Sequence, residues 1–224
     1  MSDLWEAEAQ RYDAGYDGAG REGRVIRARQ AEALELLGDG PGRVVDVGMG
    51  GGRLCLALTS RGWEVSGIDP SEAMVALARS RMPDTHERLV VGRAEALPFA
   101  DGSFDAVAAL GSLEYAVDLD TALGEIARVL RPEGHAVLSW PNFRGLAPLW
   151  RGRVLYPSLR FVKRAVPVGR PVPPPAQHPL TVEAFLDACA ATGLTGASIA
   201  YLDPNGRRVG SVRGSQIVCA LVRS

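Results

Sequence analysis

The sequence predicts an α/β fold that is built around a doubly wound, mostly parallel β-sheet. Three observations support this prediction. An apolar run over residues 44–47 ends in a glycine-rich turn over residues 48–52. A second apolar run ends at Asp69, 23 positions after Asp46 (69 − 46). Strand-like and helix-like segments then alternate as far as residue 140, which is typical of parallel strands joined by crossover helices.

A short helix is expected within residues 1–20. The next helix is expected from Arg24 to Leu37, where apolar residues recur at helical spacing and Gly38 ends the pattern. Pro41 and Gly42 then interrupt the chain before the first strand. We expect strands near 43–47, 63–68, 88–92, 104–110 and 134–140, and further helices near 52–61, 71–81 and 119–130.

The regular alternation stops after residue 140, because prolines interrupt the basic and aromatic segment 142–179 and prevent a long helix there. Thr181 predicts the N-cap of a further helix, with Leu180 packing on Phe185. The last apolar segments, 197–202 and 216–222, predict a terminal strand hairpin.

The first two parallel strands place their carboxyl ends at one edge of the sheet. Right-handed crossovers bring Asp46 and Asp69 to this edge together. The glycines at 48, 50 and 52 lack a β-carbon, so the backbone can turn sharply and a ligand can approach its N–H groups. The helix that begins there presents the positive end of its dipole. We therefore expect the site of a nucleoside-bearing ligand at this edge.

A dinucleotide site is disfavoured by one residue. Such a site needs G-x-G-x-x-G/A, in which the last small residue lets helix and strand touch. Counted from Gly48, this position falls on Arg53, whose side chain is too bulky for that contact.

Four ordered motifs carry a resemblance to a known family. They are Asp46-x-Gly48-x-Gly50-x-Gly52, the acidic Asp69 at the second strand tip, the run Gly92 to Phe99 followed by Ser103-Phe104-Asp105, and Arg131-Pro132-Glu133-Gly134. Together they span residues 44 to 140 and resemble the class I S-adenosylmethionine-dependent methyltransferases. The branch is the one that includes quinone-biosynthesis and natural-product tailoring enzymes.

The resemblance implies a Rossmann-like methyltransferase fold with a seven-stranded sheet, a reversed C-terminal strand and a small cap. It implies that the glycine loop holds the amino-acid end of S-adenosylmethionine and that Asp69 accepts both ribose hydroxyls. Asp46 is expected to act indirectly, by ordering the N–H groups of the loop near the cofactor ammonium, although it could instead only cap the glycine turn. Asp69 could instead cap the helix after Pro70. The expected cofactor contacts are Asp46, Gly48, Gly50, Gly52, Asp69, Pro70, Met74, Ala94, Glu95, Leu110, Gly111 and Tyr16.

Arg93 departs from the family pattern, because many members carry an aspartate there that accepts from the adenine amine. A guanidinium has no acceptor. Either Glu95 or a backbone carbonyl near Ala94 takes this role, or Arg93 stacks on the adenine face.

A single domain is expected, since 224 residues with 46% apolar content can bury one substantial core. We divide the chain into an N-terminal helical lid (1–40), a cofactor-binding core (41–141), a proline-rich cap (142–179) and a C-terminal helix and hairpin (180–224). The alternative for the cap is an exposed basic face or a docking surface.

The reaction needs alignment of a nucleophile with the methyl carbon more than it needs a dedicated base, since the cofactor carries its own activation. Glu114 and Tyr115 follow the fourth strand and could face the acceptor, although Tyr115 could equally be a core aromatic. His178 is the candidate base, against an exposed turn histidine. His135 and His86 are expected to lie away from the site.

The composition excludes several classes of function. The formal net charge is −1, with 25 basic and 26 acidic residues, so no global field attracts nucleic acid. No signal-type segment or apolar stretch of about 18 residues is present. The cysteines Cys55, Cys189 and Cys219 lie in apolar segments without metal-ligand or disulfide spacing, which indicates buried thiols and a cytoplasmic protein. We expect no metal, and a homodimer stays open.

The sequence thus predicts an enzyme that moves a methyl group from S-adenosylmethionine to an oxygen or nitrogen of a small molecule by in-line displacement. Carbon acceptors remain open. The alternatives are a nonenzymatic S-adenosylmethionine-binding scaffold, an enzyme that uses the same cofactor without methyl transfer, and a nicotinamide-dependent oxidoreductase.

Overall fold

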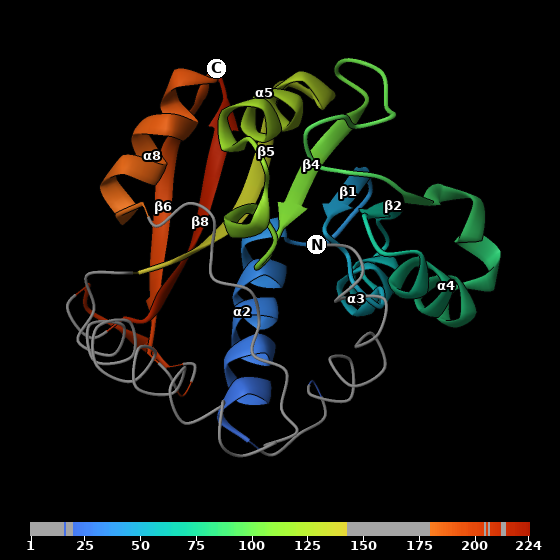
Figure 1. The fold of residues 1–224 in the computed structure, drawn as a ribbon, viewed down its shortest axis with the longest axis horizontal. Coiled ribbons are helices and arrows are strands. Elements are labelled where there is room, and N and C mark those ends of the chain that lie inside the picture. The colour runs from blue at the N-terminus through green and yellow to red at the C-terminus, as the bar shows by residue number, and fades with distance from the viewer. Residues whose placement is uncertain (1–15, 17–19, 143–179, 204, 206, 212–213) are drawn as a thin grey trace, which may run out of the picture.

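The computed structural model describes residues 16, 20–142, 180–203, 205, 207–211 and 214–224 (Figure 1). Its centre is an eight-stranded sheet in the order β3-β2-β1-β4-β5-β8-β6-β7. The strands are β1 (Arg43–Val47), β2 (Glu64–Asp69), β3 (Leu89–Val91), β4 (Phe104–Ala109), β5 (Leu130–Pro141), β6 (Leu194–Leu202), β7 (Arg208–Val209) and β8 (Gln216–Arg223).

The sheet is parallel from β3 to β5 and reverses at β8, which pairs antiparallel with both β5 and β6. The predicted doubly wound sheet with a reversed C-terminal strand is therefore confirmed. The described sheet has one strand more than predicted, because the two-residue β7 pairs with the end of β6. A strand this short carries no hydrophobic pattern that the sequence could reveal.

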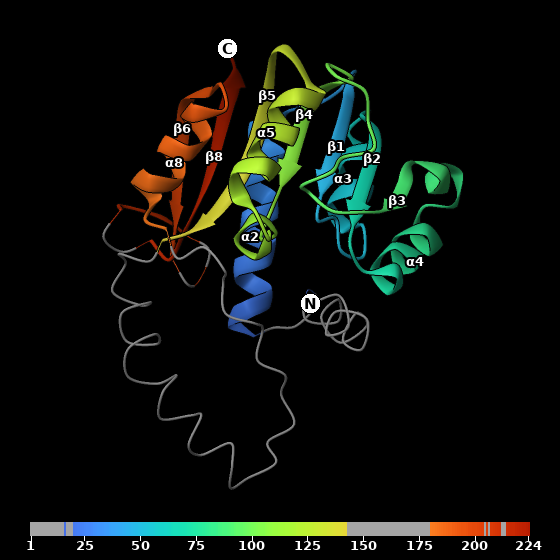
Figure 2. The same cartoon turned by 45° about the horizontal axis from the view of Figure 1, so that its top comes forward.

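Helices cover both faces of the sheet, as Figure 2 shows. On one face lie α5 (Leu119–Val129) and α8 (Val182–Ala191), and on the other lie α2 (Arg21–Leu37), α3 (Arg53–Ser60) and α4 (Glu72–Arg81). Two short 3₁₀ helices, η1 (Pro83–Arg88) and η2 (Leu113–Tyr115), complete the described elements. The predicted helices therefore lie where periodicity placed them, within a few residues at each end.

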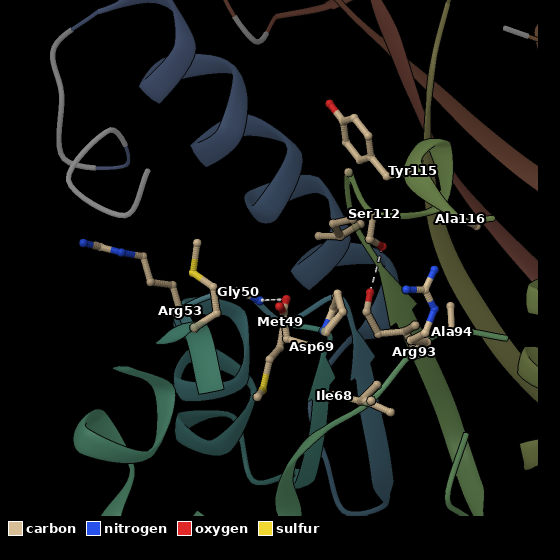
Figure 3. Close-up of a pocket in the computed structure, with 18 of the residues that line it drawn as sticks. Met49, Gly50, Arg53, Ile68, Asp69, Arg93, Ala94, Ser112, Tyr115 and Ala116 are labelled. Carbon is tan, nitrogen blue, oxygen red and sulfur yellow. Dashed lines mark hydrogen bonds between the residues drawn. The ribbon is translucent and has the colours of Figure 1, made fainter. Parts of the chain in front are cut away.

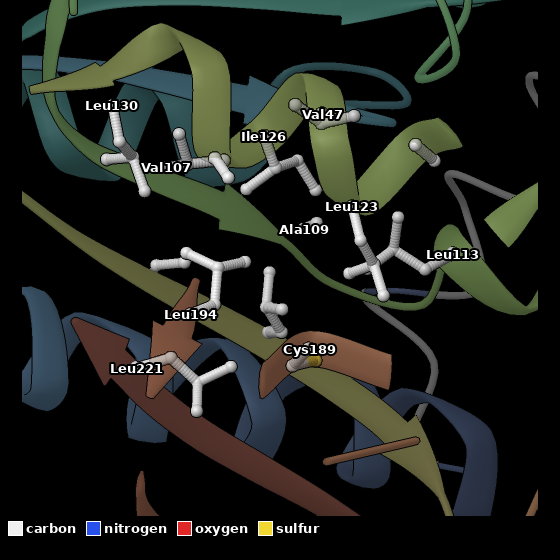
Figure 4. Close-up of a cluster of buried hydrophobic side chains, with 14 of the residues drawn as sticks. Val47, Val107, Ala109, Leu113, Leu123, Ile126, Leu130, Cys189, Leu194 and Leu221 are labelled. Atoms are coloured by element: carbon white, nitrogen blue, oxygen red, sulfur yellow. The ribbon is translucent and has the colours of Figure 1, made fainter. Parts of the chain in front are cut away.

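Each face of the sheet has its own hydrophobic core. Figure 4 shows the core beneath α5 and α8, where Leu123 and Ile126 meet side chains from β4, β5 and β8. Trp140 of β5 stacks on Phe185 of α8 with ring centroids 4.3 Å apart, and both side chains are fully buried. Such packing of apolar side chains is the main source of stability for the fold.

Short polar side chains define where three helices begin. Ser71 accepts from the Met74 amide at the start of α4, and Asp118 does the same for Thr121 at the start of α5. The predicted N-cap Thr181 accepts from the Ala184 amide at 3.3 Å, so this prediction is confirmed. These caps satisfy amide groups that the first helical turn leaves without a backbone partner.

The strand register brings the carboxyl ends of β1, β2 and β4 together. Asp46 of β1 lies opposite Gly67 of β2 on one side and Ala108 of β4 on the other. The turns that leave these three strands therefore meet at one edge of the sheet. No helix in the described ranges is both long and apolar enough to cross a membrane.

Candidate active site

A cleft opens at this edge of the sheet, between the turns that follow β1, β2 and β4 (Figure 3). The space inside it, counted to its open mouth, is about 1050 Å³. Its lining combines the glycine loop with apolar, acidic and basic side chains: Tyr16, Val47, Gly48, Met49, Gly50, Gly51, Arg53, Ile68, Asp69, Pro70, Met74, Gly92, Arg93, Ala94, Glu95, Leu110, Gly111, Ser112, Tyr115 and Ala116. A cleft of this size accommodates a ligand of nucleoside size or larger.

The glycine loop is held against the neighbouring turns by backbone contacts. The amides of Gly48 and Met49 both donate to the Ile68 carbonyl, at 2.8 and 3.1 Å. Gly48 has a φ of +79°, and a β-carbon there would lie 2.3 Å from the Ser112 β-carbon. The Ser112 hydroxyl in turn donates to the Val47 carbonyl at 2.8 Å. Only glycine at position 48 lets the turn after β4 pack this closely on the loop.

Asp69 connects the glycine loop to the start of α4. Its Oδ2 accepts from the Gly50 amide and its Oδ1 accepts from the Ser71 amide, both at 2.9 Å (Figure 3 shows the first bond). Two backbone donors fix the orientation of the carboxylate, which also lines the cleft. The ligand-facing and helix-capping interpretations of Asp69 are therefore compatible in this geometry.

A second, smaller cavity adjoins the cleft, and its lining includes one buried guanidinium and one buried carboxyl group. It shares Tyr16, Gly48, Met49 and Leu110 with the cleft and adds Ile26, Arg29, Gln30, Asp46 and Leu54. Arg29 comes from α2, and its Nη1 lies 2.3 Å from where a β-carbon on Gly111 would stand. Because Gly111 has no side chain, the guanidinium can pack against the turn after β4.

Burial dominates the electrostatics of the acid in this cavity. Burial raises the pKa of Asp46 from 3.8 to about 7. The Cys55 thiol, which donates to Oδ2 at 3.5 Å, opposes this rise, and so does the charge of Arg29. The charge of Asp69 adds to the rise. A carboxyl group with this pKa changes its protonation near neutral pH.

The N-terminal side of the cleft is formed by Tyr16. Its carbonyl accepts a hydrogen bond from Arg27 of α2, and the Arg53 guanidinium lies over its ring, 5.1 Å from the centroid. A cation over an aromatic face is attractive. These two contacts hold Tyr16 in the lining of both cavities.

At the far side of the cleft, Arg93 and Glu95 form an ion pair with Nε and Oε2 3.4 Å apart. The Glu95 Oε1 accepts from the Val117 amide at 2.5 Å. Burial alone would raise the pKa of Glu95, but hydrogen bonds from backbone amides and the charge of Arg93 outweigh it and lower the pKa below its ordinary value. Glu95 is thus an ionised carboxylate whose two oxygens already contact the Val117 amide and the Arg93 guanidinium.

Comparison with known proteins gives a consistent result. A family profile described as a methyltransferase domain matches residues 45–138. A demethylmenaquinone methyltransferase from Beutenbergia cavernae is 33% identical over 169 residues, which are 72% of this chain and 69% of that protein. This chain belongs to the methyltransferase family.

Two further comparisons concern the length of the relatives and the fold. An uncharacterized methyltransferase from Mycobacterium tuberculosis is 40% identical over 110 residues, but these are 49% of this chain and only 44% of that protein. This chain therefore matches less than half the length of that relative. A crystal structure from Thermotoga maritima, titled as an S-adenosylmethionine-dependent methyltransferase and possible histamine N-methyltransferase, superposes with a TM-score of 0.75 at 20% identity over the whole of both chains. At this identity the superposition shows a shared fold.

Most of the predicted site residues come together in the cleft. Those in its lining are Tyr16, Gly48, Gly50, Asp69, Pro70, Met74, Ala94, Glu95, Leu110, Gly111 and Tyr115. Figure 3 shows the Tyr115 side chain extending from the turn after β4, away from the sheet. Asp46 lies in the smaller cavity beside the cleft. The candidate base His178 and all of the predicted cap except Asn142 lie outside the described residues.

Two predicted site residues lie elsewhere. Gly52 is not in the lining, because it begins α3 with a φ of +75°, and a β-carbon there would lie 2.8 Å from the Ala78 β-carbon of α4. Its role in the structure is close helix packing. Glu114 does not face the cleft either, since the η2 turn buries its side chain to 8% exposure.

The sequence reasoning missed Arg29, which lies in the smaller cavity. It stands in the charged run Arg24-Val25-Ile26-Arg27-Ala28-Arg29 of α2, where it resembles any solvent-exposed arginine of an amphipathic helix. No signal in the sequence distinguishes it, because its environment is formed by Asp46 and Gly111 from distant parts of the chain.

Proposed function

We propose that this protein transfers a methyl group from S-adenosylmethionine to an oxygen or nitrogen of a small-molecule acceptor. One observation carries the proposal: in a member of the methyltransferase family, the glycine loop and the Asp69 carboxylate line a single cleft at the carboxyl edge of the sheet. Supporting it, the cleft and its side cavity offer a chemically matched partner for each part of the cofactor.

The donor and acceptor groups of the cleft fit the cofactor part by part. A carboxylate such as Asp69 accepts from paired ribose hydroxyls. Ile68, Pro70 and Ala94 give an apolar surface for a purine. The smaller cavity holds a guanidinium and a carboxyl group, Arg29 and Asp46, which complement the carboxylate and ammonium of an amino acid.

Catalysis in this proposal comes from binding and orientation. When bound, the cofactor supplies a methyl carbon that is already electrophilic. The glycine loop and Asp69 would fix the nucleoside, and the turn over Leu110 to Ser112 would hold the acceptor in line and keep water out. The Ser112 hydroxyl donates to Val47, so its orientation is fixed by the loop rather than by the acceptor.

Proton removal, where the acceptor needs it, is proposed for Tyr115 or His178. Tyr115 lines the cleft, and its side chain extends away from the sheet. Glu114 is not proposed to touch the acceptor, because it lies outside the lining. We further propose a cytoplasmic location, which the buried and unpaired cysteines Cys55, Cys189 and Cys219 support.

Calorimetric titration with S-adenosylhomocysteine tests the cofactor site. The wild-type protein is expected to bind it, and Asp69→Asn is expected to weaken binding by roughly tenfold to a hundredfold, because charge-assisted hydrogen bonds to the ribose become neutral ones. The matched control is Asp187→Asn, which changes an exposed aspartate on α8. Absence of binding, or equal affinity in the Asp69 variant, would contradict the proposal.

A screen of small hydroxyl- and amine-bearing molecules tests the transfer itself. The expected product is heavier than the acceptor by one methylene unit, with stoichiometric formation of S-adenosylhomocysteine. Cofactor binding with cleavage but without this mass gain would favour a reaction other than methyl transfer. Tight binding of a reduced nicotinamide dinucleotide would favour the oxidoreductase, which Arg53 at the start of α3 disfavours.

A further inference from the structure

Arg93 brings hydrogen-bond donors into the cleft. It lines the cleft between Gly92 and Ala94, and its side chain is 49% exposed. Within the described residues its guanidinium makes one ion pair, with Nε 3.4 Å from the Glu95 Oε2. A guanidinium carries several N–H donors and no acceptor. A ligand that lies beside Arg93 is therefore expected to present acceptor atoms to it.

The turn that carries Arg93 lies where the proposed ligand would place its purine. The Gly92 amide donates to the Asp69 carbonyl at 3.0 Å, so the turn starts beside the carboxylate that is proposed to hold the ribose. Figure 3 shows Arg93 and Ala94 on the opposite side of Asp69 from Arg53, which begins the helix after the glycine loop. With the amino-acid end of the ligand at the glycine loop, the base extends toward Arg93.

The acceptors of this turn are already combined with donors of the chain. The Arg93 carbonyl accepts from the Ala96 amide at 3.2 Å. The Glu95 carboxylate accepts from the Val117 amide at 2.5 Å and is paired with the Arg93 guanidinium. A ligand amine that approached Glu95 would also meet this guanidinium, and two donors that face each other repel. The turn thus suits an acceptor on the purine better than an amine.

We propose that Arg93 makes the purine subsite recognise the ring nitrogens of the purine and not its 6-amino group. The site would then also bind purine nucleosides that lack this amine. The inference rests on the proposed function, and it assigns Arg93 as a specificity-determining residue. The ring nitrogens of adenine are acceptors on the same edges as the amine, and a charged donor strengthens a hydrogen bond to them.

Two matched ligands isolate the 6-amino group. S-adenosylhomocysteine carries it, and the 6-deaminated analogue has a hydrogen atom in its place and keeps every ring nitrogen. Calorimetric titration of the wild-type protein is expected to give affinities within about threefold of each other. A site that bound the amine through a carboxylate would instead lose roughly tenfold to a hundredfold with the analogue.

Variants of Arg93 assign the effect to this side chain. Arg93→Asp supplies an acceptor, so it is expected to prefer S-adenosylhomocysteine over the deaminated analogue by roughly tenfold to a hundredfold. Arg93→Met supplies neither donor nor acceptor and is expected to show no such preference. The matched control is Arg88→Asp, at an exposed arginine that pairs with Glu64 outside the cleft, and it should behave as wild type.

Replacing single ring nitrogens by carbon tests what Arg93 binds. The 1-deaza and 7-deaza analogues of S-adenosylhomocysteine each lack one acceptor. At least one of them is expected to bind the wild-type protein about tenfold more weakly than S-adenosylhomocysteine, and this loss should be absent in Arg93→Met. Melting temperatures of the variants check that they are folded, as expected for a half-exposed side chain.

The wild-type measurements alone can overturn the inference. A preference for S-adenosylhomocysteine over the deaminated analogue beyond about threefold would show that the amine is recognised, and the proposed function would remain intact. Deaza losses that are absent in wild type, or equal in wild type and Arg93→Met, would overturn the role of Arg93. Failure of the wild-type protein to bind any of these ligands would instead refute the proposed function, so the failures are distinguishable.

Discussion

Replacing Asp46 with asparagine should change how the stability of the protein depends on pH. The carboxyl group is 2% exposed, and burial, opposed by Cys55 and Arg29, raises its pKa from 3.8 to about 7. A tenfold change in proton affinity corresponds to about 1.4 kcal/mol, so the folded state loses about 4 kcal/mol when this carboxyl group is fully ionised. Asparagine has nearly the same shape, keeps an acceptor for the Cys55 thiol and cannot ionise.

The direction follows from the raised pKa. The folded protein holds this proton more tightly than the unfolded chain, so the contribution to stability is complete below pH 3.8 and is lost as pH rises to about 7. Between pH 5 and pH 8 the wild-type protein should lose roughly 2–3 kcal/mol through Asp46, and Asp46→Asn should not. His135 and Glu114 also titrate, but they do so in both proteins and cancel in the difference.

Urea unfolding at pH 5 and pH 8 measures this difference directly. Asp84→Asn, which changes an exposed aspartate in η1, controls for the loss of one carboxylate. The reasoning would be refuted if wild type and Asp46→Asn lost the same free energy of unfolding between the two pH values. A variant that is less stable than wild type at pH 8 would also be inconsistent with a costly buried charge.

Three further substitutions test the packing around the site. Gly48→Ala should destabilise the fold by about 2–4 kcal/mol in urea unfolding, because the new β-carbon would lie 2.3 Å from that of Ser112 at a φ of +79°; an unchanged midpoint would show that the loop can move. Gly124→Ala, in α5 with open space around the new β-carbon, should stabilise by up to about 1 kcal/mol, seen as a higher melting temperature. Trp140→Phe should cost about 2–3 kcal/mol, since it removes the indole N–H that donates to Leu180 at 3.1 Å and part of a fully buried ring; a loss near zero would contradict that account.

Most helices and strands could be predicted from the sequence, because they depend on local patterns. Apolar runs of strand length, helical periodicity and cap residues such as Thr181 each report on a few consecutive residues, and the structure confirms the elements that they predict. The two-residue β7 was missed, since pairing with β6 rather than local pattern defines it. Its Arg208 also holds Glu32 of α2, a contact between residues 176 positions apart that no local pattern encodes.

The sequence predicts the site residues that follow from backbone geometry. It does not predict the contacts between side chains of different helices and strands. Gly48 and Asp69 follow strands whose carboxyl ends must share one edge, so their place in the cleft was predictable. Gly52 has the same sequence signature as Gly48, yet it faces Ala78 instead of the cleft. The direction in which each glycine faces depends on how α3 and α4 pack.

The sequence by itself determined most of the strands and helices, the edge of the sheet at which the cleft opens and the family to which the chain belongs, because all of these follow from periodicity, turns and short motifs along the chain. Only the tertiary structure decided that Arg29 lies beneath Gly111, that Glu114 is buried away from the cleft and that Asp46 is an acid with a pKa near neutrality. The physical reason is that burial and charge arise from segments brought together by folding, and their effect on a group depends on neighbours that lie far from it in the chain.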